Sequence, residues 1–174
     1  MTQDKQQRLN DKLLPEIEAF KQQCKTLQLA TQDTDYLPNA SYAPFALADD
    51  GFYILVSELA RHGVNLKVMP AVSAMMVEDE SKAKTIFARR RLTFDTQVQL
   101  IEKGSEGFEK GIAALSQRFG EMIDNLAGLK DFNLFKLTPN KGLYVKGFGQ
   151  AFTLSGDELL TLEWKTDGHH GESA

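Results

Sequence analysis

The chain contains little cysteine, proline or histidine, and it has no long apolar run. Its 174 residues include one cysteine, five prolines and three histidines. A single cysteine excludes an intrachain disulfide and a zinc site built from several thiolates, and it is typical of a reducing compartment. No apolar stretch approaches the roughly 20 residues that span a bilayer. Since the polar N-terminus also lacks the pattern of a secretory signal, we expect a cytoplasmic protein with no membrane partner.

An excess of positive charge is also absent. The sequence has 20 Lys and Arg against 24 Asp and Glu, which gives a net charge of -4. Proteins that bind nucleic acid usually present a broad basic face, so we expect no nucleic-acid partner. Nucleophile motifs such as Gly-x-Ser-x-Gly are missing. Gly147 and Gly149 form a Gly-x-Gly pair without the third glycine of a dinucleotide-binding fingerprint. We expect them to mark a curved strand in which another part of the backbone comes close.

The N-terminal residues 1–25 carry the pattern of one amphipathic helix. Apolar side chains recur at helical spacing between Leu9 and Cys24. Pro15 interrupts this stretch, and a proline fits a helix best in its first turn. We therefore expect the ordered part of the helix to begin near Leu14.

Residues 26–156 alternate between short apolar segments and turn signals, which is typical of antiparallel β structure. We expect strands at 26–31, 41–46, 52–57, 71–77, 85–95, 132–137 and 142–153, the last two joined by a turn at Pro139 and Asn140. Helices are expected at about 58–66, capped by Ser57, and after Ser105. The pattern favours a single mainly β domain over 1–174, with a barrel and inserted helices at 26–156 and a C-terminal segment with a flexible tail at 157–174.

The run Arg89-Arg90-Arg91 is the densest positive feature of the chain. In a strand, Arg89 and Arg91 would lie on one face and Arg90 on the other. Three adjacent guanidinium groups repel one another unless anions lie close by. Two interpretations stay open: a site for a phosphorylated or carboxylated ligand, or pairing with the acidic run at 78–80.

Two of the three histidines, His169 and His170, lie side by side in the polar C-terminal tail. Imidazole titrates near neutral pH and is the commonest nitrogen ligand for metals. A polar terminus is usually disordered, so composition alone favours a frayed end over an arm that carries a ligand. His62, on an expected helix, is more often a surface residue than a ligand. Asp131 is more often a turn or cap residue, and its alternative role is to orient a histidine ligand.

Several segments resemble heme-utilisation proteins of the HutZ/HugZ type, and the resemblance extends over about 9–156. The resembling runs include 27–31, 38–45, 60–62, 75–80, 87–94, 118–121, 129–132 and 142–151. That group belongs to the superfamily of FMN-binding split barrels typified by pyridoxamine-phosphate oxidase. The resemblance implies a six-stranded antiparallel split β-barrel with flanking helices that forms a homodimer, with ligand sites at the subunit interface.

The resemblance also implies a function. Members of the group bind heme, open the porphyrin ring with oxygen and an electron donor, and release iron for iron acquisition. It implies that His169 is the axial iron ligand, with His170 as the alternative, and that Asp131 is its carboxylate partner across the dimer interface. Arg91 corresponds to a strand arginine near the heme, so Arg91 and Asp131 are the catalytic candidates. The candidate cofactor-binding residues are His169, His170, Asp131, Arg91, Arg89 and His62.

Two further functions stay open. The chain could be an FMN-binding oxidoreductase, in which the arginine strand contacts the flavin phosphate. It could also be a heme carrier or storage protein without catalysis.

Overall fold

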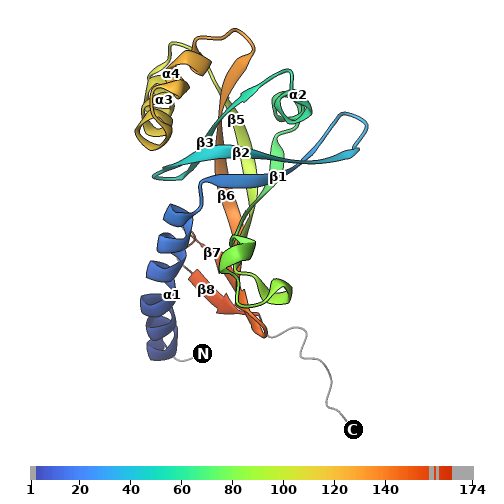
Figure 1. Cartoon of the computed structure of the whole chain (residues 1–174). Helices are drawn as coiled ribbons and strands as arrows, with labels where there is room; N and C mark the ends of the chain where they lie inside the picture. Colours follow the sequence, from blue (N-terminus) through green and yellow to red (C-terminus); the bar gives the residue numbers. More distant parts are fainter. Residues whose placement is uncertain (1–2, 157–158, 160, 166–174) are drawn as a thin grey trace.

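Strands with alternating burial form the centre of the structure, a computed structural model that describes residues 3–156, 159 and 161–165 (Figure 1). In β1, for example, Leu27, Leu29 and Thr31 are buried and the residues between them are exposed. The strands are β1 (Thr26–Gln32), β2 (Pro38–Ala48), β3 (Gly51–Ser57), β4 (Ala71–Val77), β5 (Arg91–Ile101), β6 (Phe132–Gly147), β7 (Gln150–Ser155) and β8 (Thr161–Trp164).

Among these strands, six close into an antiparallel barrel. Their order is β3-β2-β1-β4-β5-β6, and the barrel closes because β3 also pairs with β6. β7 and β8 continue the sheet beyond β6. The prediction of a mainly β, six-stranded antiparallel barrel with flanking helices is confirmed. β8 itself was not expected from the sequence.

The helices flank the barrel and supply part of two apolar cores. They are α1 (Gln3–Gln23), α2 (Arg61–Val68), α3 (Glu106–Phe119) and α4 (Met122–Ala127). α1 lies beside β7 and β8, whereas α3 and α4 lie together near the opposite end of the molecule (Figure 1). α1 contributes Leu13, Ile17 and Phe20 to the core inside the barrel. Leu115 of α3 and Ile123 of α4 belong to a second core outside it.

α1 runs without a break through Pro15, so the expected helix start near Leu14 is wrong. A proline inside a helix removes one backbone hydrogen bond and costs about 3 kcal/mol. Leu13, Ile17 and Phe20 on the same helix are 3%, 3% and 1% exposed. Burying each such side chain contributes about 1.5 to 3 kcal/mol, which offsets the cost of the proline.

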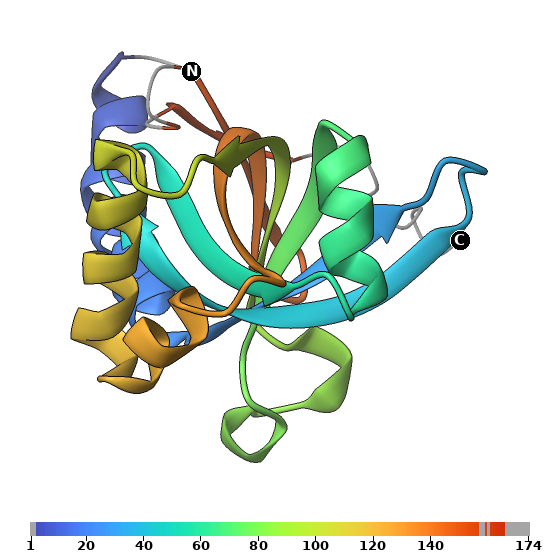
Figure 2. The same cartoon turned by 90° about the horizontal axis from the view of Figure 1, so that it is seen from above.

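The first half of the expected strand at 85–95 is also wrong. The chain forms two short 3-10 helices, η1 (Glu80–Lys82) and η2 (Ile86–Ala88), and β5 begins only at Arg91. The connection between β4 and β5 projects from the barrel (Figure 2). Phe87 is 87% exposed there, so its apolar side chain does not mark a core strand. Arg89 and Arg91 consequently do not share the face of one strand.

The expected turn at Pro139 and Asn140 is replaced by one continuous strand, β6. The partner of β5 shifts from Lys141 at Asp95 to Pro139 at Thr96, which marks a β-bulge at this point. Proline has no N–H to donate and is tolerated at such a bulge.

The remaining differences concern glycine and helix boundaries. Gly147 and Gly149 do not mark a curved strand but flank the tight turn between β6 and β7, where Gly149 has φ +66°. Such a left-handed backbone favours glycine. α2 begins at Arg61, three residues later than expected, and α4 was not expected.

A polar cluster attaches α1 to β6. The Tyr144 hydroxyl donates to Glu16 Oε1 at 2.7 Å, and Lys146 Nζ donates to Glu16 Oε2 at 2.5 Å. Burial alone would raise the pKa of Glu16, but these hydrogen bonds and the charges of Lys146 and Arg90 lower it below 4.5. The ionised carboxylate therefore stabilises the contact between the helix and the barrel.

Replacing Glu16 with Gln should lower the free energy of unfolding at pH 7 by about 1 to 2 kcal/mol, because hydrogen bonds to a charged group are lost. Since the folded pKa of Glu16 is below its unfolded value, its contribution is fully present above pH 4.5 and is lost as pH falls through the folded pKa. Urea unfolding of wild type and Glu16→Gln should therefore converge in acid. Asp11→Asn, an exposed change on the same helix, is the control and should match wild type at pH 7.

Candidate functional site

The side chains of Arg89 and Arg90 are held by the acidic segment that precedes them. Arg89 Nε donates to Glu78 O at 2.9 Å, and the Arg89 guanidinium pairs with Glu80 at 3.2 Å. Arg90 pairs with Glu78 at 3.2 Å and lies 4.9 Å from the centre of the Phe20 ring. The pairing with the acidic run, which the sequence left open, is therefore found for these two arginines.

Arg91 differs from its neighbours, because its half-buried side chain makes no hydrogen bond or ion pair with another described residue. Residues on the same face of the sheet follow from the register, since opposite residues in antiparallel strands share a face. Five residues share a face of the sheet with Arg91: Met75, Val77, Thr93, Leu143 and Val145. Together with Arg91 they are called the Arg91 face. None of the five is charged. A lone guanidinium in uncharged surroundings is suited to bind a carboxylate or phosphate.

Asp131 lies directly before β6 and is fixed by the end of β3. Ser57 Oγ donates to Asp131 Oδ2 at 2.5 Å, and the Glu58 N–H donates to Asp131 O at 2.8 Å. The Leu59 N–H donates to Ser57 Oγ at 3.0 Å. The second carboxylate oxygen, Asp131 Oδ1, accepts no hydrogen bond from the described residues. It is therefore available to accept an imidazole N–H.

Within one chain, β6 separates Asp131 from Arg91. Asp131 precedes Phe132 at one end of β6, and Arg91 is paired with Val145 near the other end. At about 3.3 Å per residue, the strand runs on the order of 40 to 45 Å between these points. One chain does not bring these two candidates to one ligand.

Lys165, the last described residue, lies at the Arg91 end of the sheet. Lys165 N–H donates to Ala151 O at 2.8 Å, Ala151 is paired with Val145, and Val145 is paired with Arg91. Lys165 therefore lies in the same row of the sheet as Arg91, three strands away. At about 4.8 Å between strands, this row is on the order of 15 Å wide.

The two tail candidates, His169 and His170, lie outside the described residues. Within the described part, no group of three or more His, Cys, Asp and Glu side chains is arranged to hold a metal ion. Nor is any helix of that part long and apolar enough to cross a membrane.

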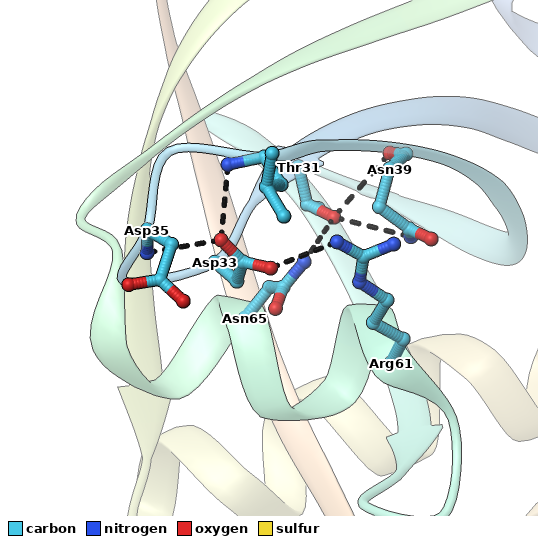
Figure 3. A network of polar contacts seen from close by, with 7 residues as sticks. Thr31, Asp33, Asp35, Asn39, Arg61 and Asn65 are labelled. Carbon is cyan, nitrogen blue, oxygen red and sulfur yellow. Dashed lines mark hydrogen bonds and ion pairs between the residues drawn. The ribbon is translucent and has the colours of Figure 1, made fainter.

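A polar network ties α2 to the hairpin of β1 and β2 (Figure 3). Asn65 Nδ2 donates to Thr31 Oγ1 at 2.9 Å, and both residues are 2% exposed. Asn39 Nδ2 also donates to Thr31 Oγ1, at 3.4 Å. At the start of the helix, Arg61 pairs with Asp33 at 2.8 Å. The network fixes the position of the helix that carries His62.

Asn65→Ala should lower the free energy of unfolding by about 2 to 3 kcal/mol, because it removes a buried hydrogen bond and leaves a small void. Val64→Ala, at a neighbouring position that is 50% exposed, should change it by less than about 0.5 kcal/mol. Urea unfolding measures both. Equal effects of the two variants would show that the network does not anchor α2.

His62 is half-buried in α2 and lies next to the segment that holds Asp131. Burial lowers the pKa of His62, which favours the neutral imidazole at neutral pH. A Cβ at Gly63 would contact the backbone of Ser57, so the helix packs directly against the residue that binds Asp131. No hydrogen bond joins His62 to another described residue. His62 is thus near the Asp131 end and remote from the Arg91 end.

Sequence reasoning missed the residues that hold the candidates in place. Ser57 was interpreted only as a helix cap, although its hydroxyl binds Asp131. Glu78 was considered as a pairing partner, but its hold on the backbone was not foreseen: Glu78 N–H donates to Arg90 O at 2.8 Å, and Arg90 N–H donates to Glu78 Oε2 at 3.3 Å. The sequence does offer one signal for this contact. Glu78 follows one expected strand, and Arg90 comes shortly before the next observed strand begins.

The sequence model of the family described as pyridoxamine 5'-phosphate oxidase matches residues 13–146. This range includes about half of α1 and nearly the whole barrel. The chain belongs to the pyridoxamine 5'-phosphate oxidase family. The family match includes His62, Arg91 and Asp131, and it ends before the tail histidines.

Two relatives of known structure place the chain more narrowly within this family. The protein HutZ of Vibrio cholerae serotype O1, named a heme oxygenase, is 52% identical over 167 residues, which cover 96% of this chain and 95% of HutZ. A crystal structure of HutZ, named there as the heme storage protein, has a TM-score of 0.74 at 54% identity and covers 78% of this chain and 95% of that one. ChuZ of Campylobacter jejuni has a TM-score of 0.83 at 32% identity, covering 93% and 66% of the two chains. The predicted resemblance to HutZ/HugZ-type proteins is confirmed.

Proposed function

We propose that the chain is a cytoplasmic heme oxygenase that binds heme between two copies of itself. With oxygen and an electron donor, it opens the porphyrin ring and releases iron for iron acquisition. The observation that carries the proposal is the 52% identity to the heme oxygenase HutZ over nearly the whole of both chains. The geometry of Arg91 and Asp131 supports it.

The described residues fit the chemistry of heme. Its porphyrin is a flat apolar ring with two carboxylates, and the Arg91 face offers uncharged side chains around one guanidinium with no protein partner. Guanidinium binds carboxylate in a bidentate manner. Bound heme supplies the iron that activates oxygen and is itself the ring that is opened.

A second copy of the chain completes the proposed site. His169 follows Lys165 by four residues, and four extended residues reach at most about 14 Å. Lys165 lies in the row of Arg91, whereas Asp131 of the same chain is on the order of 40 to 45 Å away along β6. The tail therefore reaches an Asp131 only if a second copy brings its own Asp131 close to the Arg91 face.

Each residue has a distinct role in the proposal. His169 ligates the heme iron through one imidazole nitrogen, and Asp131 Oδ1 of the second copy accepts the N–H of the other. A carboxylate in that position fixes the orientation of the imidazole and raises its basicity. Arg91 binds a propionate. Ser57, through its hydrogen bond of 2.5 Å, holds Asp131 Oδ2 and leaves Oδ1 to accept the imidazole N–H.

The function is tested by loading the full chain with hemin without oxygen and then adding ascorbate and air. We expect the Soret band to disappear and ferrous iron to be released to a chelator. Arg91→Gln should weaken hemin binding about 10-fold to 100-fold, since charged hydrogen bonds contribute roughly 1.5 to 3 kcal/mol. Arg89→Gln is the matched control, because Arg89 is already bound to Glu78 and Glu80. It should change hemin affinity by less than about threefold.

Two other functions are favoured by particular observations and predict different results. Storage of heme agrees with the name given to the HutZ crystal structure, and it predicts a Soret band that persists after reductant and air. An FMN-dependent oxidoreductase agrees with the family match, and it predicts a yellow purified protein that releases flavin on denaturation. Either result would replace the proposal.

A further inference from the structure

A cavity of about 500 Å³ lies between α1 and the end of the barrel. Its walls include Leu14 and Ile17 of α1, Phe52 of β3, Phe94 of β5 and Leu154 of β7. A mostly apolar cavity of this size falls in the range of small-molecule sites.

The cavity is separate from the Arg91 face, although both involve β5. Phe94 is 2% exposed and points into the barrel, whereas Arg91 and Thr93 lie on the opposite face of the same strand. Successive side chains of a strand point to opposite faces. The sheet therefore lies between the cavity and the proposed heme site.

The charges that line the cavity select against an anionic ligand. Its acidic lining residues are Glu18, Asp49 and Asp50, and Lys21 is the sole basic one among the described lining residues. Lys21 is already paired with Glu18 at 2.6 Å. A carboxylate on a ligand would therefore find no unpaired cation among the described lining residues. A ligand ammonium group, in contrast, can compete with a lysine for one of the carboxylates.

Two of these carboxylates are accessible to a ligand. Asp49 pairs with Lys110 at 3.3 Å and Asp50 pairs with Lys136 at 2.6 Å, and their side chains are 93% and 62% exposed. Ion pairs between exposed side chains are weak and exchange partners readily. Asp49 and Lys110 are both exposed, so an ammonium group at the mouth of the cavity can replace Lys110. Lys136 is 20% exposed, and the ammonium group approaches Asp50 from its exposed side.

We propose that this cavity binds an amphipathic amine, with its apolar part beneath α1 and its ammonium group at Asp49 and Asp50. The site lies beyond the proposed heme function and does not depend on it. Affinity should rise about threefold to fourfold for each methylene that enters the cavity.

The test is calorimetric titration of the full chain with hexylamine, octylamine, octanol and octanoate. Octylamine should bind about tenfold more tightly than hexylamine, octanol more weakly than octylamine, and octanoate most weakly. The double change Asp49→Asn and Asp50→Asn should reduce octylamine affinity about fivefold and leave octanol unchanged. The matched double change Lys110→Gln and Lys136→Gln should raise octylamine affinity, because it frees the same carboxylates.

Variants that fill the cavity provide the control for its location. Ala48→Phe and Leu14→Phe enlarge partly buried lining residues from opposite walls, and each should abolish octylamine binding while thermal unfolding stays cooperative. Tighter binding of octanoate than octylamine would overturn the proposal, as would unchanged octylamine binding in both filled variants. Competition between octylamine and hemin would also overturn it, because the two sites would then be one. Weakened hemin binding in Arg91→Gln with intact octylamine binding would support separate sites.

Discussion

His169→Ala should weaken hemin binding at least a hundredfold, whereas His170→Ala should change it by less than about threefold. Removing a group that only orients a metal ligand commonly costs 10-fold to 100-fold in affinity, so removing the ligand itself should cost at least as much. The two histidines are adjacent in the sequence, and in an extended chain their side chains point in opposite directions. We therefore expect one imidazole to face the iron and the other to face away.

Titration of hemin into each variant, followed by the Soret band, measures this difference. A large loss in His170→Ala alone would move the ligand assignment to His170. Full hemin affinity in a variant that lacks both tail histidines would disprove tail ligation and, with it, the proposed arrangement of the site.

The barrel could be predicted because its strands obey a local rule. β1 alternates buried and exposed residues along its whole length, and the helix after Ser105 shows a clear apolar stripe in the sequence. Ser105 also caps α3 as expected, since its hydroxyl accepts a hydrogen bond from the Phe108 N–H at 3.2 Å. Where the local pattern and the tertiary packing agree, the sequence is sufficient to predict the helix or strand.

The errors arose where tertiary packing overrides a local rule. Pro15 and Pro139 both signal a break, yet α1 continues because its flanking side chains are buried, and β6 continues because a bulge accommodates the proline. Ile86 and Phe87 resemble strand residues, but they are 61% and 87% exposed on the connection before β5. Local propensity is a weak prior compared with packing.

The candidate site was predicted only in part, because its contacts join distant positions. Arg91 and Asp131 were indicated by resemblance. Geometry then distinguished Arg91 from the other arginines through Glu78, which lies more than ten residues earlier in the sequence. Ser57 and Asp131 are separated by 74 residues. No periodicity within the sequence can indicate a hydrogen bond over that separation.

Mixing two inactive variants should restore about half of the heme sites per dimer. If His169 of one copy works with Asp131 of the other, a dimer of one His169→Ala chain and one Asp131→Asn chain contains one site with both changes and one site with neither. If both residues came from the same chain, every site in the mixed dimer would carry one change. The separation of Asp131 from the row of Lys165 along β6 favours the first arrangement.

The experiment requires co-expression of the two variants with different affinity tags and purification of the mixed dimer by both tags. The parent homodimers should bind hemin weakly, with Asp131→Asn weakened about 10-fold to 100-fold. The mixed dimer should bind one hemin per dimer with wild-type affinity, and its Soret band should be lost on addition of ascorbate and air. Weak binding at both sites of the mixed dimer would show that each site takes His169 and Asp131 from the same chain, and it would overturn the shared arrangement. A monomeric wild-type chain that binds hemin tightly would contradict the shared site altogether, because one chain holds Arg91 and Asp131 at opposite ends of β6.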